Sequence, residues 1–252
     1  MKKLQKVLPL LLALALVFSL AACAPKDGAE QPSATPDAAT PDVEAPEETV
    51  PEDEPTPENG PNDLGDNSAA RGAIQAGSWD GDVFTNEWVN ISFTLPSDWS
   101  ALSAEEMQAQ IELGLAAAGV DESAAAMQEA AMARSLNDFT IMGALAVPSV
   151  TATYENTEGN PLTANLGAEE YFNMLKLQLS SMGIEFGEPE DIVIAGETYL
   201  LGKGSIAYGD ISMYQSFYLR KLDGAIVMFT AMYMDDSEAA VSDFFASITP
   251  AK

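Results

Sequence analysis

The clearest pattern in the chain is a strict alternation of apolar and polar residues from Val89 to Leu95. Successive side chains of a strand point to opposite faces, so this run predicts a strand with one buried face. A shorter apolar segment, Val83 to Thr85, precedes it. Asn86-Glu87 lies between the two segments and is expected to turn a hairpin.

Two more hairpins are expected in the C-terminal half. Asp223-Gly224 favours a tight hairpin turn, because both residues tolerate positive φ. Gly196-Glu197 is a second turn candidate. The four strands that flank these turns are predicted at 192–195, 198–206, 211–221 and 225–233. In the third of them Tyr214 and Tyr218 fall on the polar side of the alternation, and they could bind a ligand only if that side is open. A further extended run is expected over 139–154, bent or broken at Pro148.

Helices are predicted where apolar residues recur every three or four positions. The clearest runs from Glu169 to Met182 and ends before Gly183. Ser103 and Glu106 form a capping-box pair at the start of another. An alanine-rich helix over 121–135 and a final helix over 237–247, capped by Asp235 or Asp236, complete the set.

These elements together predict one α+β domain over 73–252. Strands that mostly connect by hairpins form an antiparallel sheet, and amphipathic helices must bury their apolar sides against its faces. The 180 residues from Ala73 to Lys252 are enough for a single core. We expect a mostly antiparallel sheet with helices packed on its faces.

The segment from Asn86 to Trp99 carries a resemblance to a known family. It resembles the opening hairpin of PsbP-like domains, which ends in a Pro-x-x-Trp turn, here Pro96 to Trp99, before the first helix. The terminal strand pair and helix are similar too, so the resemblance covers about 83–248. It implies an α+β sandwich that serves as a binding scaffold rather than an enzyme. The family includes photosystem extrinsic subunits and many bacterial lipoproteins.

The N-terminus has a different pattern. Three lysines within the first six residues precede an apolar run from Val7 to Ala22. This run is 16 residues long, whereas a membrane-spanning helix needs roughly 20. A positive start, a short apolar stretch and small residues before the cleavage site are typical of a secretory signal peptide, here 1–22.

Leu20-Ala21-Ala22-Cys23 resembles the lipobox of bacterial lipoproteins. The resemblance implies cleavage between Ala22 and Cys23, with diacylglycerol on the Cys23 sulfur and an N-acyl chain, such as palmitate, on its amine. Two or more acyl chains give stable anchoring, so the lipid bilayer is an expected partner. Cys23 is the only cysteine, which excludes a disulfide within the chain. A soluble signal peptide with an incidental cysteine is the alternative.

Residues 23–72 are expected to be a disordered tether that follows the lipidated cysteine. The segment after Cys23 contains nine of the fifteen prolines, thirteen acidic residues and no aromatic residue. Such a composition cannot bury enough apolar surface to offset the entropy of ordering. A spacer that lifts the domain off the membrane is the favoured interpretation, and a tail that binds a basic partner is the alternative.

The charge of the domain excludes some partners. Residues 73–252 hold 26 acidic and 6 basic residues, a net charge of −20. This surface repels phosphate backbones and anionic lipid headgroups, so nucleic acid is not expected as a partner. An envelope protein or a cationic ligand is compatible with it. The layout indicates the extracytoplasmic face of a cell membrane, and the absence of an outer-membrane cue favours a Gram-positive organism.

Catalytic residue types are scarce. The chain has no histidine, and its one cysteine is at the lipid position, so His-dependent and Cys-dependent catalysis is excluded. No cofactor is predicted. A non-enzymatic binding or assembly-accessory domain is the leading hypothesis. A receptor for a small ligand or a divalent metal is the alternative, and a carboxylate-dependent hydrolase comes third.

Two groups of residues remain as weak site candidates. Carboxylate oxygens are ligands that Ca²⁺ prefers, so Asp80, Asp82 and Glu87 are candidate metal ligands. The three tryptophans, Trp79, Trp88 and Trp99, are expected to anchor the core around the first hairpin. An aromatic platform for a sugar or a peptide is the alternative for them.

Overall fold

The computed structural model describes residues 68–118, 131–158, 160, 163–208 and 211–252. The signal peptide, Cys23 and most of the tether lie outside these residues. So does most of the alanine-rich helix expected over 121–135, of which residues 131–134 are helical. The described elements are mostly antiparallel strands with a few helices, which confirms the α+β fold.

The main sheet contains eight strands, and every pair in it is antiparallel. Their order is β4 (Trp99–Ala101), β5 (Ser135–Gly143), β6 (Ser149–Asn156), β11 (Ala225–Met234), β10 (Ile211–Leu222), β9 (Glu197–Tyr208) and β7 (Glu185–Phe186), with β8 (Glu190–Ile194) also paired to β9. The extended run expected over 139–154 is thus a hairpin of two strands.

Both C-terminal hairpins have two-residue turns. Asp223 and Gly224 have φ values of 45° and 78°, as a tight turn of this kind requires. In the other hairpin the turn residues are Ala195 and Gly196, with φ values of 51° and 84°. The sequence-based expectation of Gly196-Glu197 was wrong by one residue, because Glu197 already pairs with Ile194.

A second, three-stranded sheet consists of β1 (Ser78–Asp80), β2 (Val83–Asn86) and β3 (Ile91–Thr94). The last strand begins two residues later than the alternation predicts. The Asn86 side chain accepts a 2.9 Å hydrogen bond from the backbone N–H of Val89, which keeps Val89 in the turn. Asn90 has a φ of 64° and completes this turn.

The helices begin with local caps. α3 (Ala104–Ala118) has the expected capping box, in which the Ser103 N–H donates to the Glu106 carboxylate at 2.8 Å. α6 (Glu238–Ser247) follows a 3₁₀ turn at Asp235–Ser237. The expected capping by Asp235 or Asp236 was wrong, because both lie within this turn and Ser237 occupies the N-cap position.

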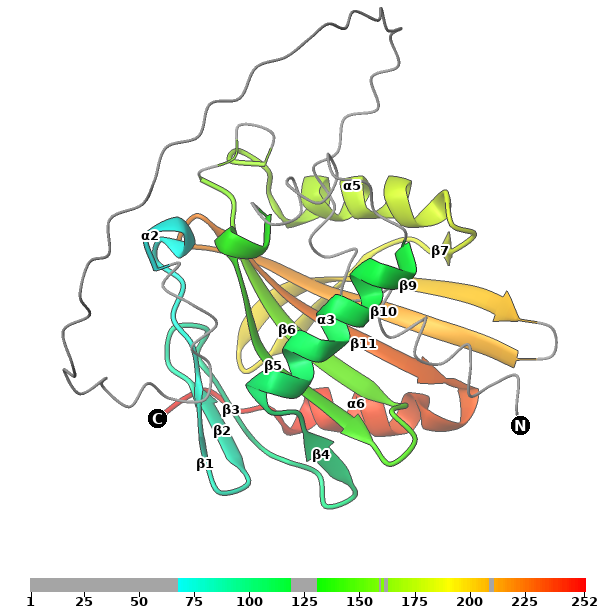
Figure 1. Ribbon diagram of the computed structural model, residues 1–252, viewed down its shortest axis with the longest axis horizontal. Coiled ribbons are helices and arrows are strands. Elements are labelled where there is room, and N and C mark those ends of the chain that lie inside the picture. Colours follow the sequence, from blue (N-terminus) through cyan, green and yellow to red (C-terminus); the bar gives the residue numbers. More distant parts are fainter. Residues whose placement is uncertain (1–67, 119–130, 159, 161–162, 209–210) are drawn as a thin grey trace, which may run out of the picture.

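Helices cover the main sheet from both sides (Figure 1). α3 and α5 (Ala168–Ser180) lie on one face, and α6 lies on the other together with the small sheet. α5 approaches β9 closely where a glycine leaves room. A Cβ atom on Gly202 would lie 2.1 Å from the ring of Phe172. The short α2 (Ser68–Arg71), which composition assigned to the tether, lies against β6, where the Asn156 amide donates to the Ala70 carbonyl.

Two apolar cores result, one on each face of the main sheet. The core under α6 and the small sheet is rich in aromatic residues and includes Phe84, Phe93, Phe139, Phe229, Phe244 and Phe245. The core under α5 includes Tyr171, Phe172, Leu175, Leu179, Phe217 and Leu219. Both surfaces of β10 are therefore buried along much of the strand.

Candidate functional site

The three candidate metal ligands do not lie together. Asp80 and Asp82 flank the turn between β1 and β2, whereas Glu87 follows the far end of β2. The strand between them separates Asp82 and Glu87 by about 16 Å at about 3.3 Å per residue. In the described part of the chain, no three Asp, Glu, Cys or His residues form a group that could hold a metal ion.

The three tryptophans pack against the aromatic core. The Trp79 ring lies 5.1 Å from that of Phe84, and the Trp99 ring stacks 5.7 Å from that of Phe244. All three indoles are partly buried. These contacts favour core anchoring over an aromatic platform.

Trp88 also has a polar contact. Its indole N–H donates to the Asp223 carboxylate at 3.1 Å, while its ring lies 5.4 Å from Tyr154. This bond joins the first hairpin to the β10–β11 turn.

The polar side of β10 is largely covered at Tyr218 and partly covered at Tyr214. The ring of Tyr218, only 5% exposed, lies 3.9 Å from that of Phe245 on α6. Tyr214 stacks on Tyr233 of β11 at 5.5 Å. Alternation alone classed these tyrosines as polar-facing, but the aromatic body of a tyrosine packs readily in a core.

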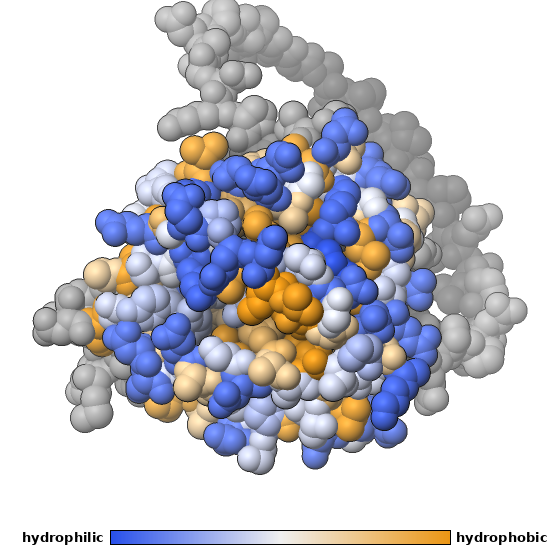
Figure 2. Space-filling model, turned by 180° about the vertical axis from the view of Figure 1, so that it is seen from behind, coloured by the Kyte–Doolittle hydropathy of each residue, from blue (hydrophilic) through white to orange (hydrophobic). Residues whose placement is uncertain are grey.

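A cleft of about 240 Å³ opens beside these tyrosines, between α6 and β8. Its lining residues are contributed by five elements and comprise Glu190, Ile192, Val193, Ile194, Leu201, Lys203, Tyr218, Tyr233, Glu238, Val241, Ser242, Phe245 and Ala246. We call this feature the α6–β8 cleft. Figure 2 shows the face that carries α6, where hydrophobic side chains gather in a central hollow and hydrophilic ones surround it.

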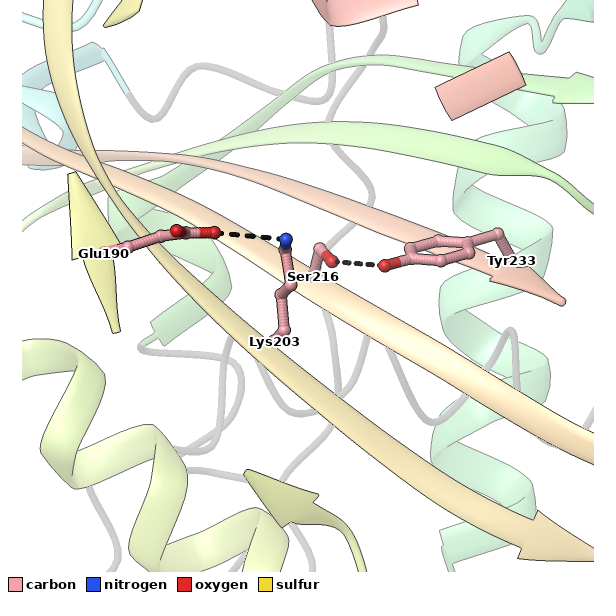
Figure 3. Close-up of polar contacts among 4 residues, drawn as sticks. All are labelled: Glu190, Lys203, Ser216 and Tyr233. Atoms are coloured by element: carbon pink, nitrogen blue, oxygen red, sulfur yellow. Dashed lines mark hydrogen bonds and ion pairs between the residues drawn. The ribbon is translucent and has the colours of Figure 1, made fainter. Parts of the chain in front are cut away.

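Two polar contacts order this region (Figure 3). The Lys203 ammonium of β9 forms a 3.1 Å ion pair with the Glu190 carboxylate of β8. The hydroxyl groups of Ser216 and Tyr233 are 3.0 Å apart and hydrogen-bonded. Both members of the ion pair are about half exposed, at 50% and 61%, so they can exchange partners with a ligand.

The cleft is electrostatically negative. Burial raises the pKa of the Tyr218 phenol well above its ordinary value, and nearby Tyr233, Glu238 and Glu190 raise it further. A phenol so shifted is neutral at physiological pH. It can donate a hydrogen bond, but it cannot act as a base there.

Buried carboxylates lie elsewhere and have structural partners. Glu155, 4% exposed, accepts a 2.5 Å hydrogen bond from the Tyr171 hydroxyl. Burial raises the pKa of Glu155, while Arg134 and Lys221 partly oppose the shift. Arg220 is similarly engaged, because it pairs with Glu197 at 2.8 Å and lies over the Tyr199 ring. The Glu155–Tyr171 hydrogen bond links β6 to α5, and the Arg220–Glu197 ion pair links β10 to β9.

The sequence offered only faint signals for the α6–β8 cleft. Val193 is 66% exposed although it lies in an apolar strand segment, and Lys203 is the one basic residue of β9. Neither signal identifies the facing helix, because α6 lies more than thirty residues away in the chain. The arrangement suits binding of a group that is part apolar and part charged.

Comparison with known proteins gives structural matches alone. No family model and no curated protein matches the chain. The structure is similar to cyanobacterial PsbP (CyanoP) from Synechocystis sp. PCC 6803, with 13% identity over 71% of this chain and 98% of that chain, at a TM-score of 0.40. A PsbP structure is therefore among the matches, as the opening hairpin led us to expect.

Two further structures match with similar sequence identities and TM-scores. LpqN of Mycobacterium tuberculosis, a protein involved in cell envelope biogenesis, is 11% identical over 64% of this chain and 83% of its own, with a TM-score of 0.36. A protein from Bacteroides thetaiotaomicron VPI-5482 is 10% identical over 68% of this chain and 49% of its own, with a TM-score of 0.37. None of the helices described here is long and apolar enough to cross a membrane.

Proposed function

We propose that this chain is an extracytoplasmic lipoprotein, anchored by acyl chains on Cys23, whose folded domain binds a partner in the α6–β8 cleft without chemical change. The anchor is supported by the Leu20-Ala21-Ala22-Cys23 motif and by the acidic, proline-rich segment that follows it. This composition suits a spacer between the membrane and the domain.

The observation that carries the binding role is the α6–β8 cleft itself. Its wall combines apolar side chains with a few polar groups, which is the usual character of a binding site. The raised pKa of Tyr218 keeps its phenol neutral, so Tyr218 is not activated as a base, and Lys203 is ion-paired with Glu190. These features support a binding role over a catalytic one.

Site-specific photocrosslinking in the native host tests this proposal. A photoreactive phenylalanine analogue at Ser242, on the α6 side of the cleft, should give a defined adduct on irradiation. The same analogue at Glu105 on α3, on the opposite face of the sheet, should not give that adduct.

An adduct of equal yield at both positions, or no adduct at Ser242, would contradict a binding role for the cleft. Chemical conversion of the crosslinked molecule by the purified protein would contradict the non-enzymatic role. That result would favour the hypothesis of a carboxylate-dependent hydrolase, and Glu190 and Glu238 would be the first residues to substitute.

A further inference from the structure

The charges in the α6–β8 cleft do not balance. Three charged side chains line it: Glu190, Lys203 and Glu238. Lys203 is paired with Glu190 at 3.1 Å, so Glu238, an exposed residue in the first turn of α6, is the charged group of the cleft that has no ion-pair partner among the residues that the structure describes. Within the described residues Glu238 forms no ion pair, because the two ion pairs there are Lys203–Glu190 and Arg220–Glu197.

The rest of the cleft suits a cation with an apolar stem. Tyr218, Tyr233 and Phe245 contribute aromatic rings, and a cation within about 6 Å of such a ring is attracted by it. Ile192, Leu201 and Val241 provide aliphatic surface for methylene groups. An anionic ligand would have to displace Glu190 from Lys203 and would then face Glu238.

The edge of the cleft favours a polypeptide over a free amine. β8 pairs with β9 alone among the described strands, so its outer edge has backbone groups available to an extended chain. Val193, 66% exposed, lies in this strand and lines the cleft, and residues flanking a bound side chain would cover it. The net charge of −20 over residues 73–252 attracts a basic segment over longer distances.

We infer that the α6–β8 cleft binds the side chain of a lysine or arginine within a basic polypeptide segment of an envelope protein, with Glu238 pairing the cation and β8 contacting the flanking backbone. This inference rests on the proposed binding function of the cleft and names its ligand class. A long basic side chain can place its stem against the aliphatic wall while its charged end reaches the acidic rim.

Fluorescence anisotropy with two matched peptides tests the inference. The probe is a fluorescein-labelled Ser-Val-Lys-Val-Ser peptide with blocked ends, and its partner carries norleucine in place of lysine, which removes the charge and keeps the stem. The protein is the chain from residue 23 to residue 252 with Cys23→Ser, so that it stays in solution. The lysine peptide should bind roughly tenfold more tightly than the norleucine peptide, a difference of about 1.4 kcal/mol.

Three variants locate the binding. Glu238→Gln should weaken binding of the lysine peptide roughly threefold to fivefold, as expected for loss of one exposed charge pair. Glu105→Gln removes the same charge from the opposite face and should leave the affinity within twofold. Ser242→Trp fills the cleft and changes no charge, so it should abolish binding, whereas nonspecific attraction to the acidic tether would survive it. Circular dichroism melting confirms that each variant is folded.

Each contrary result has a distinct meaning. Equal affinity for the lysine and norleucine peptides would overturn the cationic ligand, and an adduct at Ser242 would still support a binding cleft. Equal weakening by Glu105→Gln and Glu238→Gln would contradict binding of the peptide in the α6–β8 cleft.

Complete competition by n-butylamine at the concentration of the peptide would contradict a polypeptide ligand and assign the cleft to free amines. Failure of both the peptide and the Ser242 crosslink would overturn the binding function too.

Discussion

The side-chain amide of Asn86 donates a 2.8 Å hydrogen bond to the carboxylate of Asp138, which joins the small sheet to the main sheet. The backbone N–H of Gly77 and the hydroxyl of Tyr154 donate to the same carboxylate at 2.8 Å and 2.9 Å. Asp138 is 1% exposed, and burial raises its pKa above the ordinary value, although these hydrogen bonds act in the opposite direction.

This shift predicts how the Asp138→Asn variant responds to pH. Because the pKa of Asp138 is higher in the folded than in the unfolded protein, its contribution to stability is complete below the unfolded pKa and is lost as pH rises through the folded pKa. The loss of unfolding free energy in Asp138→Asn should therefore be larger near pH 4 (about the unfolded value) than at about pH 7. Urea unfolding at both pH values measures it.

The control for this experiment is Asp80→Asn, at the exposed tip of the β1–β2 turn. Its effect should be small and similar at both pH values. A larger loss in Asp138→Asn at neutral pH than in acid would contradict the direction of the shift.

The close approach of α5 to β9 predicts a large effect of Gly202→Ala. The added methyl would lie 2.1 Å from the ring of Phe172, which is fully buried and cannot move freely. Overpacking of this kind costs about 1–3 kcal/mol, measurable by chemical denaturation. Gly187→Ala has nothing within 4 Å and should change stability by less than about 0.5 kcal/mol.

A companion variant checks the cause. Combining Gly202→Ala with Phe172→Leu should cost less than the sum of the two single variants, since leucine gives way to the new methyl. Additive losses would mean that the clash is absorbed elsewhere.

The Ser216–Tyr233 hydrogen bond predicts an effect of Tyr233→Phe on stability. Ser216 and Tyr233 are 1% and 4% exposed, so the substitution leaves the Ser216 hydroxyl buried without its partner. The unfolding free energy should fall by about 1–3 kcal/mol. Adding Ser216→Ala should cost little more, and a sum equal to the two separate losses would show that the hydroxyl groups are not coupled.

The proposed lipid anchor predicts that Cys23→Ser changes the distribution of the protein between the membrane fraction and the medium. A serine oxygen does not accept the diacylglycerol, so most of the protein should move from the membrane fraction to the medium. Immunoblots of the two fractions measure this change. Ala24→Ser, the neighbouring substitution, should leave the protein with the membrane. If Cys23→Ser stays in the membrane fraction to the same extent, the protein is not anchored through Cys23.

Local signals predicted much of the secondary structure. The Asp223-Gly224 turn lies where the residue pair placed it, and the capping box at Ser103 and Glu106 forms. The second turn shifted by one residue, because Ala195 adopts a positive φ that the sequence does not demand of alanine. Which two residues form the turn depends on how the flanking strands pair.

The candidate site was not predictable in the same way. Trp79, Trp88 and Trp99 were noticed because they are close in sequence, yet each packs against the core. Glu238 drew no notice, since a single glutamate at the start of a helix is ordinary. Glu238 matters because the only lysine of the cleft, Lys203, pairs with Glu190 and so does not pair with Glu238.

The sequence by itself determined the long strands of the C-terminal half, the Asp223-Gly224 turn and the helices α3, α5 and α6, and it predicts an export signal and a lipidation site. These depend on residues a few positions apart, whose periodicity and φ preferences act locally. Only the tertiary structure decided that α6 covers the tyrosine side of β10 and that a cleft remains between α6 and β8. That outcome depends on packing between residues far apart in the chain, such as Tyr218 and Phe245, which no local pattern encodes.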